Sequence, residues 1–318
     1  MKAVVYDRYG PPEALRVEDV PRPSPGPAEV LVEVVSVSVN LSDWECLRGS
    51  PLYARIGGLR RPARPTLGSD IAGRVAAVGP GVTRFGVGDE VYGDNLDRKG
   101  GFAEYAVAPE SALAPKPADL TFDAASTIPQ AGPIALQGTA LVRPGSRVLI
   151  NGAGGGSGAF AIQLAKRAGA HVTGVDNAGK LDFMRARGAD EVIDYATDDF
   201  TRGGRRYDLV LDLVAYRSVF AYRRALAPGG RYLCVGGTVR TLLRVLSIGT
   251  IAGRLTGRRI GVLVVKLGPE HFGPVADLCV AGDVEIDIDR TFGLEDVPEA
   301  LRTVGEGRAL GKVVIEVA

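Results

Sequence analysis

The stretch Arg147-Val148-Leu149-Ile150-Asn151-Gly152-Ala153-Gly154-Gly155-Gly156-Ser157-Gly158 decides the fold of this chain. A β-prone run leads into five glycines within seven positions, and residues 159–167 continue with a helical pattern. Glycine permits a sharp turn and removes the Cβ atoms that would hold a pyrophosphate away, while the free N–H groups of the helix start face the phosphates. The stretch therefore predicts a strand, a phosphate-binding turn and a helix.

The residues after this turn alternate between strand and helix patterns. Helices are predicted at residues 180–187 and 217–226, and strands at residues 171–176, 191–194, 207–212, 231–235 and 260–267. Such alternation predicts a doubly wound parallel sheet that helices cover on both faces. Ligands of these sheets bind at the carboxyl ends of the strands, where the strand order reverses. The glycine turn lies there if residues 147–150 form the first strand of the sheet.

The second predicted strand ends at Asp176, 18 positions after Gly158. A carboxylate at this place can accept hydrogen bonds from the ribose hydroxyls of the adenosine half of a dinucleotide. It would also repel the 2′-phosphate of NADP, although Lys180, helped by Asn177, could reach that phosphate. We therefore expect use of NAD(H) at least comparable to that of NADP(H). A tight helix-entry loop without a ligand is the less favoured alternative.

A glycine pair, Gly236-Gly237, follows the strand predicted at residues 231–235. Glycine at this place would let a nicotinamide ring approach the backbone, although a simple strand-end turn is the alternative. The residues expected to bind the cofactor are therefore Gly152, Ala153, Gly155, Gly156, Ser157, Gly158, Asp176, Asn177, Lys180, Gly236 and Gly237.

The first part of the chain has a different pattern. Residues 1–116 contain many short β-rich runs separated by turns rich in proline and glycine, which predicts an all-β or barrel-like domain. The tail returns to mixed structure and closes with a strand at residues 312–317. We therefore expect an α/β protein in which residues 1–116 and the return segment 268–318 form one domain, and residues 117–267 form the dinucleotide-binding domain.

Length and composition limit the possible classes of protein. A chain of 318 residues is long enough for two domains, and a net charge of +1 argues against general nucleic-acid binding. The three cysteines form no Cys-x-x-Cys pair and suggest no disulfide framework. No apolar run reaches membrane-spanning length, and the N-terminal residues lack the apolar core of a signal peptide. We therefore expect a soluble cytoplasmic protein.

An ordered series of motifs runs through nearly the whole chain. Its members are Val39-Asn40-Leu41-Ser42-Asp43 with Arg48-Gly49, Leu67-Gly68-Ser69-Asp70-Ile71-Ala72-Gly73-Arg74-Val75, Val87-Gly88-Asp89-Glu90-Val91, Gly101-Phe102-Ala103-Glu104-Tyr105, residues 148–158, Arg187-Gly188-Ala189-Asp190, Val192-Ile193-Asp194-Tyr195 and Gly311-Lys312-Val313-Val314-Ile315. With these motifs the chain resembles the zinc-independent medium-chain dehydrogenases/reductases of the quinone oxidoreductase type. The resemblance implies a GroES-like β-barrel domain, a Rossmann domain and a homodimer formed through the edge of the Rossmann sheet.

The resemblance also provides a test for a metal. Zinc alcohol dehydrogenases of the same superfamily carry a cysteine where Asn40 stands and a His-Glu pair where Ser69-Asp70 stand. Asparagine and serine are poor zinc ligands beside thiolate and imidazole. The four-cysteine structural zinc lobe is missing as well, and the chain has only two histidines. We therefore expect no zinc, which makes a zinc-type alcohol dehydrogenase the least favoured function.

Without zinc, the expected reaction is transfer of a hydride from NAD(P)H to a quinone or an α,β-unsaturated carbonyl. Negative charge then develops on the substrate oxygen, which requires hydrogen-bond donors and a proton source. The candidate catalytic residues are Asn40, Asp43 and Tyr53. The Asn40 amide could donate to the substrate oxygen or fix a turn, Asp43 is favoured to anchor its loop, and a surface or core role is favoured for Tyr53.

One span of the chain is free of acidic residues. Residues 213–269 contain no Asp or Glu but ten Arg or Lys. Five of the arginines lie within or beside the apolar segment 242–255, namely Arg240, Arg244, Arg254, Arg258 and Arg259. Attachment to an anionic membrane surface or to nucleic acid is one interpretation, but we favour a helix and loop near the dimer edge and expect no nucleic-acid partner. The span is the one local indication of an alternative function, a cofactor-binding interaction or sensor protein with little turnover.

Overall fold

The computed structural model describes residues 1–317, which form two compact units. Unit 1 contains Met1–Gly132 and Lys266–Ala318, and unit 2 contains Pro133–Val265. Each unit has a hydrophobic core of its own, and each is described separately below.

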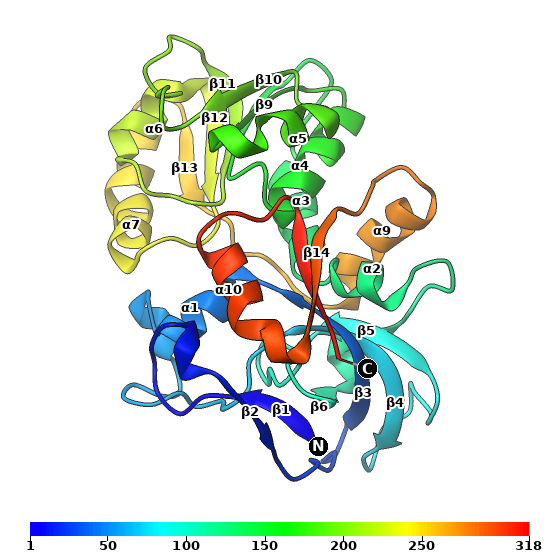
Figure 1. Cartoon of the computed structure of the whole chain (residues 1–318). Helices are drawn as coiled ribbons and strands as arrows, with labels where there is room; N and C mark the ends of the chain where they lie inside the picture. Colours follow the sequence, from blue (N-terminus) through cyan, green and yellow to red (C-terminus); the bar gives the residue numbers. More distant parts are fainter. Residues whose placement is uncertain (318) are drawn as a thin grey trace. The chain divides into compact units, whose positions relative to one another are not determined.

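Unit 2 contains a six-stranded, fully parallel sheet in the order β10-β9-β8-β11-β12-β13 (Figure 1). The chain moves from β8 outward to β9 and β10, then crosses back to β11 on the other side of β8. The order reverses between β8 and β11, which confirms the predicted doubly wound sheet and marks the crevice where such sheets bind ligands. The strands are β8 (Arg147–Asn151), β9 (His171–Asp176), β10 (Glu191–Asp194), β11 (Tyr207–Asp212), β12 (Leu226–Cys234) and β13 (Arg259–Val262).

Helices connect these strands, and the central strands are apolar because they are buried on both faces. Val148, Leu149 and Ile150 of β8 have no exposed surface. The helices of unit 2 are α3 (Ala131–Thr139), which crosses the boundary between the units, α4 (Gly156–Arg167), η4 (Ala178–Lys180), α5 (Leu181–Ala186), α6 (Val219–Ala225), α7 (Val239–Arg244), the π-helical turn η5 (Val245–Gly249) and α8 (Thr250–Arg254).

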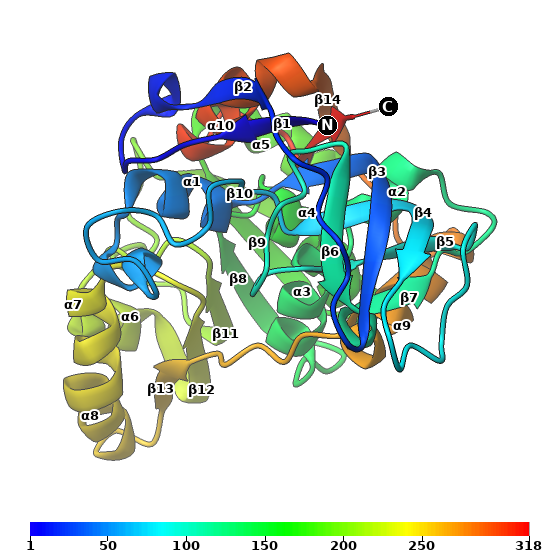
Figure 2. The same cartoon turned by 90° about the horizontal axis from the view of Figure 1, so that it is seen from below.

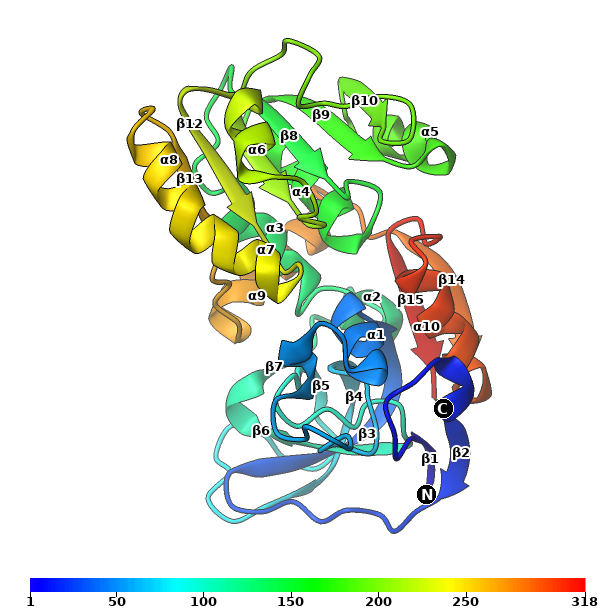
Figure 3. The same cartoon turned by 90° about the vertical axis from the view of Figure 1, so that its left-hand side faces the viewer.

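Two segments of unit 2 are defined more closely by the structure than by the sequence. Residues 239–254, for which a helix and loop were favoured, form a continuous helical segment beside β13 (Figure 3). Their glycines and β-branched residues lower helix propensity, and packing against β13 compensates for this. The apolar run at residues 260–267 was predicted as a strand of full length, but β13 ends at Val262.

Unit 1 is built on a curved, mostly antiparallel sheet in the order β14-β15-β3-β4-β5-β7, with β6 also paired to β3 (Figure 2). The long strand β3 organises it, because its first half pairs with β6, its last residues pair with β15, and β4 runs along its other edge. The strands are β1 (Lys2–Val5), β2 (Arg16–Asp19), β3 (Glu29–Val39), β4 (Asp70–Val78), β5 (Glu90–Asp94), β6 (Tyr105–Pro109), β7 (Leu113–Pro115), β14 (Ile288–Gly293) and β15 (Lys312–Glu316).

The end of the chain completes the sheet of unit 1, since β15 lies between β14 and β3. Residues 117–132 were expected in the second domain, but the helix α2 within them contacts β3 and β4, so the units divide at Gly132 rather than near residue 116. The helices of this unit are η1 (Pro12–Ala14), α1 (Leu41–Arg48), η2 (Leu52–Arg55), η3 (Glu110–Ala112), α2 (Phe122–Ser126), α9 (Pro269–Val280), η6 (Leu294–Asp296) and α10 (Val297–Gly305). Among residues 1–317, no helix has the length and apolar character needed to cross a membrane.

Candidate functional site

The glycine turn between β8 and α4 is held to the neighbouring strand by its backbone. The N–H groups of Gly152 and Ala153 both donate to the carbonyl of Val175 in β9, over 2.9 and 3.1 Å. Gly152 has a φ of +84°, a conformation that side chains rarely adopt. Ala153 is fully buried, so this predicted cofactor residue supports the turn from inside the unit.

The first turn of α4 leaves donors available for an anion. Gly155 is the N-cap of this helix, and it has no side chain with which to cap the helix. The N–H groups of Gly156, Ser157 and Gly158 are the first three of the helix and have no carbonyl partner within it. A Cβ atom on Gly158 would lie 2.4 Å from the carbonyl oxygen of Gly152, so only glycine lets helix and turn approach so closely. This cradle fits a phosphate group.

The acidic residue at the end of β9 is tied to the turn. One carboxylate oxygen of Asp176 accepts from the Gly154 N–H at 3.0 Å, and the other accepts from the Asn177 N–H at 2.9 Å. The Lys180 ammonium lies 3.8 Å from the second oxygen, and both charged side chains are buried. A Cβ atom on Gly154 would meet the Lys180 side chain at 2.5 Å. Asp176 and Lys180 therefore partly neutralise each other over the glycine turn.

The second glycine pair follows β12 at the carboxyl edge of the sheet. Gly236 and Gly237 both have positive φ, and a Cβ atom on Gly237 would lie 3.1 Å from that of Ala215. In the same sheet, a buried carboxylate joins the three neighbouring strands β8, β11 and β12. Asp212 of β11 accepts from the Asn151 amide at 2.8 Å and from the Tyr232 hydroxyl at 2.9 Å. The sequence analysis missed this network, which fixes the strand ends that flank the crevice.

A cluster of buried polar side chains lies in unit 1 where β3 ends. The Lys312 ammonium donates to the side-chain oxygen of Asn40 at 2.6 Å and lies 3.9 Å from Asp70. All three residues are buried. Burial lowers the pKa of Lys312, and burial together with the nearby Asp94 carboxylate raises the pKa of Asp70. Because an ammonium can only donate, the oxygen of the Asn40 amide must face Lys312 and its nitrogen must face the other way.

The Asn40 amide nitrogen is buried and has no hydrogen bond of normal geometry among residues 1–317. It lies close enough to Asp70 to lower the pKa of that carboxyl, against the larger raising effect of burial. The position of Asn40 is therefore set by two charged neighbours rather than by a turn alone.

Asp43 holds the loop that precedes β4. Its fully buried carboxylate accepts from the backbone N–H groups of Asn40 and Gly68, each at 3.1 Å, and from the Lys99 ammonium at 3.3 Å. The first of these bonds caps the start of α1. Three donors on one carboxylate give Asp43 the geometry of an anchor, which is the role favoured from the sequence.

Tyr53 pairs with an acidic residue that the sequence analysis did not single out. Its hydroxyl donates to the carboxylate of Glu45, 3.2 Å from each oxygen. Burial is the main cause that raises the pKa of Glu45, and burial followed by the Glu45 charge raises the pKa of Tyr53. Both side chains are only partly buried. The pair therefore combines a phenol that keeps its proton with a carboxyl that holds a proton more readily than usual.

The residues at the former zinc positions do not fit a zinc ion. The Asn40 oxygen is engaged by an ammonium, Ser69 is a weak donor, and neither supplies the thiolate or imidazole that zinc prefers. In the described part of the chain, no group of three or more His, Cys, Asp or Glu residues is placed to hold a metal ion.

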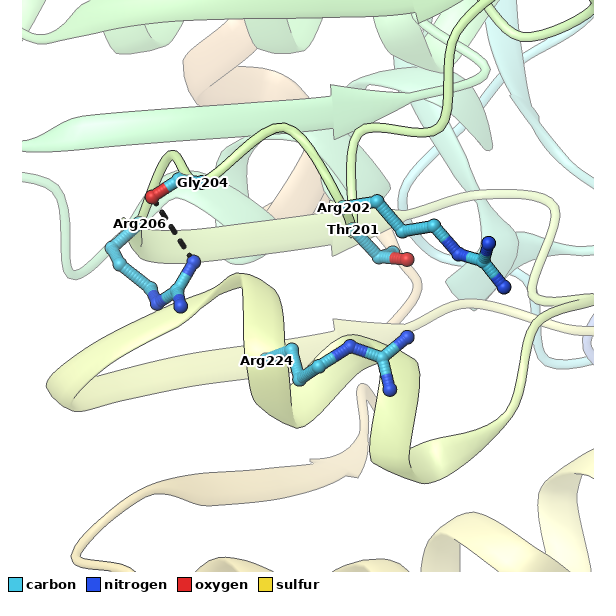
Figure 4. Close-up of a pocket in the computed structure, with 5 residues that line it drawn as sticks. All are labelled: Thr201, Arg202, Gly204, Arg206 and Arg224. Carbon is cyan, nitrogen blue, oxygen red and sulfur yellow. Dashed lines mark hydrogen bonds between the residues drawn. The ribbon is translucent and has the colours of Figure 1, made fainter.

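A pocket of about 390 Å³ lies elsewhere in unit 2 and is lined by Thr201, Arg202, Gly204, Arg206 and Arg224 (Figure 4). Its loop immediately precedes β11, so it lies at the amino end of that strand. The cofactor crevice of a doubly wound sheet lies at the carboxyl ends. This pocket is therefore separate from the glycine turn, and the turn is the better candidate for the cofactor site.

Comparison with known proteins agrees with this geometry. The alcohol dehydrogenase GroES-like domain model matches residues 26–118, and the zinc-binding dehydrogenase model matches residues 187–315. The chloroplastic quinone-oxidoreductase QR1 of Triphysaria versicolor is 32% identical and covers 99% of this chain and 98% of its own length. The chain belongs to the quinone oxidoreductase-like family of medium-chain dehydrogenases/reductases.

Solved structures of related proteins share the fold of this family member. The quinone oxidoreductase from Coxiella burnetii has a TM-score of 0.91 at 30% identity, covering 100% of this chain and 99% of its own. A mycobacterial protein solved in complex with NADPH has a TM-score of 0.85 at 26% identity, covering 99% of each chain. The expected GroES-like and Rossmann domains are thereby confirmed.

Proposed function

We propose that this protein transfers a hydride from NAD(P)H to a quinone or an α,β-unsaturated carbonyl without a metal ion. The observation that carries the proposal is the cradle at the start of α4, where uncapped N–H groups meet a glycine that permits close approach. The quinone oxidoreductases among its relatives support the substrate class. When bound, the nicotinamide would supply the hydride. The chain itself then has to bind and orient the cofactor and the substrate, and it has to deliver a proton.

In unit 2, the backbone supplies most of the binding. The N–H groups of Gly156, Ser157 and Gly158 would bind the pyrophosphate, and Asp176 would accept from a ribose hydroxyl. Gly236 and Gly237 would leave space for the nicotinamide. The Asp176 carboxylate supports NAD(H) use at least comparable to NADP(H) use, because it would repel a 2′-phosphate. Titration of both reduced cofactors by fluorescence tests this, and a hundredfold preference for NADPH would overturn it.

In unit 1, two side chains would act on the substrate oxygen. The Asn40 amide would donate a hydrogen bond to it, and the Tyr53 hydroxyl would give it a proton. In the state with Glu45 protonated, the Glu45 proton would then pass to the Tyr53 oxygen, and a proton from bulk solvent would return to Glu45. Asp43 stays in the proposal only as the anchor of this loop.

The proton pathway can be tested by removing one hydroxyl. Tyr53→Phe removes the donor, and we expect kcat to fall at least about tenfold with little change in KM, since proton transfer contributes on this scale or above. The matched variant Glu45→Gln keeps the Tyr53 hydroxyl but has no carboxyl proton to pass on, so it should lower kcat mainly at low pH, where the wild-type carboxyl is protonated. Equal kcat values for wild type and Tyr53→Phe would remove Tyr53 from the mechanism.

The function as a whole is tested by NAD(P)H oxidation with a panel of quinones and enones. Sustained turnover with one substrate class supports the proposal. Tight cofactor binding without turnover on any of them would favour the alternative, an interaction or sensor protein of the same fold. Metal analysis of the active protein excludes or establishes a zinc alcohol dehydrogenase.

A homodimer through the edge of the unit 2 sheet belongs to the same proposal. β13 is the edge strand, and the apolar chain continues past it with Val264 82% exposed. An unpaired edge of this kind can pair with a second copy. Sedimentation velocity tests this, with Val264→Asp expected to shift the protein toward monomer. A cytoplasmic location also stays a prediction, since one compared relative is chloroplastic.

A further inference from the structure

One helical segment of unit 2 has an outer face that the fold leaves uncovered. α7, η5 and α8 form a single helix over residues 239–254, because Val245 and Thr250 at the junctions keep right-handed helical backbone angles. We call this segment the arginine helix. It runs as one rod beside β13 (Figures 2 and 3).

The inner face of the arginine helix belongs to the unit 2 core. Val245, Gly249 and Ala252 are buried, and the helix contacts β13 and α6. A Cβ atom on Gly249 would lie 2.8 Å from a methyl carbon of Ile260 in β13, so glycine permits the close approach. This packing fixes which side of the helix faces outward.

The outer face is apolar to an unusual degree. Leu243, Leu246 and Ile251 are 62%, 59% and 61% exposed, and Leu255, which directly follows the helix, is 81% exposed. Single exposed apolar residues are common, but several large ones on one helix face mark a surface that binds a protein, a membrane or a ligand. Within residues 1–317, no other segment covers these side chains, so the free energy of burying them is left for a binding partner.

The same face carries positive charge that the chain does not neutralise. Arg240, Arg244 and Arg254 are exposed, and none has a hydrogen-bond or ion-pair partner among residues 1–317. No acidic residue occurs between Asp212 and Glu270. The charge is therefore available to an anionic partner.

The charge and the apolar surface together restrict what can cover this face. A second copy placed on this face by a two-fold axis would bring the same arginines together without any acidic partner. An anionic phospholipid surface matches both features, because phosphate groups pair with arginine and the acyl boundary takes up leucine and isoleucine. We propose that the outer face of the arginine helix docks on an anionic phospholipid surface, with the helix axis in the plane of that surface.

Vesicle binding by the purified full chain tests the proposal. We use vesicles of phosphatidylcholine alone and of phosphatidylcholine with phosphatidylglycerol in equal amounts, and measure sedimentation of the protein with each. Wild type should bind the anionic vesicles only, and added salt should weaken the binding. Arg240→Gln/Arg244→Gln/Arg254→Gln should lower the partition coefficient roughly a hundredfold. Leu243→Ser/Leu246→Ser/Ile251→Ser should also abolish stable binding.

A matched control separates the helix from net charge. Arg60→Gln/Arg61→Gln/Arg64→Gln removes the same number of exposed arginines from a loop of unit 1 and should bind vesicles like wild type. Cofactor titration and thermal unfolding show that each variant is folded. Equal loss in both arginine variants, or no binding by wild type, overturns the proposal. So does a wild-type dimer that the serine variant converts to monomer while neither binds vesicles, because a second copy then covers the face.

Discussion

The glycine turn of unit 2 and the buried charged cluster of unit 1 are made in opposite ways. The turn consists of consecutive residues, and its interactions come from backbone N–H groups, carbonyls and the absence of Cβ atoms. The cluster consists of side chains from distant segments, and the Lys312–Asn40 bond joins residues that are 272 positions apart. One site depends on local sequence, and the other depends on how the sheet of unit 1 is assembled.

Strand register brings the cluster together. Val313 lies opposite Val39 in the pairing of β15 with β3, and Asp70 lies opposite Ser38 in the pairing of β4 with β3. These two registers place Lys312, Asn40 and Asp70 side by side. The cofactor half of such a protein can therefore be recognised from a short motif, whereas the buried cluster of the other half can be recognised only once the complete sheet is known.

The largest effect is expected in the cluster, because its charges are fully buried. Lys312→Met leaves Asp70 without its ammonium, and we expect the free energy of unfolding to fall by about 3–5 kcal/mol, the usual cost of breaking a buried pair. The double variant Lys312→Met/Asp70→Asn should recover much of the loss, since no charge then stays buried. Urea unfolding measures both changes. Two single-variant losses that simply add in the double variant would show that the pair is not coupled.

The next test concerns the turn. Gly158→Ala would place a Cβ atom 2.4 Å from the Gly152 oxygen and 2.6 Å from the Ala153 backbone. Neither atom is the end of a flexible side chain, so we expect at least about 3 kcal/mol of destabilisation, the upper range for overpacking, and loss of cofactor binding.

Gly155→Ala is the matched control for that variant, because its Cβ atom would lie 3.6 Å from the Gly152 oxygen, an ordinary contact. Its unfolding midpoint should stay close to that of wild type. Equal destabilisation by the two alanines would show that the turn is not limited by close backbone approach.

These two sites also show which parts of the structure could be predicted from the sequence alone. The strand, turn and helix around Gly158 were predictable, because glycine spacing and hydrophobic periodicity are local signals. Asp43 was expected from the sequence to anchor its loop more than to transfer protons, but its partner Lys99 was not found, because 56 residues separate them. Glu45 was missed for a different reason. It stands in α1, a short helix without a clear apolar pattern, and only the fold shows that the Tyr53 hydroxyl reaches it.

A third test uses the pH dependence of stability. Burial raises the pKa of Asp94 from 3.8 to about 6, and Asp94 lies opposite Asp70 in the sheet. The folded state then holds a proton that the unfolded state releases, so this stabilisation is complete below pH 3.8 and is lost as the pH rises through about 6. The contribution is about 2–3 kcal/mol, because each pKa unit corresponds to about 1.4 kcal/mol.

Asp94→Asn removes this titration with little change of shape. The variant should therefore gain stability relative to wild type as the pH rises through that window, as measured by urea unfolding at several pH values. A constant difference between the two proteins across the window would show that the Asp94 carboxyl titrates normally. The cluster would then be less isolated from solvent than its burial implies.

The smallest effect is expected for cofactor choice, where the test is whether unit 2 binds the cofactor through its backbone alone. Asp176→Ser removes the carboxylate that holds Lys180 at 3.8 Å, and it leaves that ammonium able to bind a 2′-phosphate. We expect the ratio of NADPH to NADH affinity to rise about tenfold, equivalent to about 1.4 kcal/mol, as measured by fluorescence titration of both cofactors. Asp182→Ser, which removes a fully exposed acid from the following helix, should leave the ratio unchanged. If both variants shift the ratio equally, general electrostatics governs the preference. If neither does, the backbone cradle binds both cofactors without help from Asp176, and the contrast between the two sites becomes sharper.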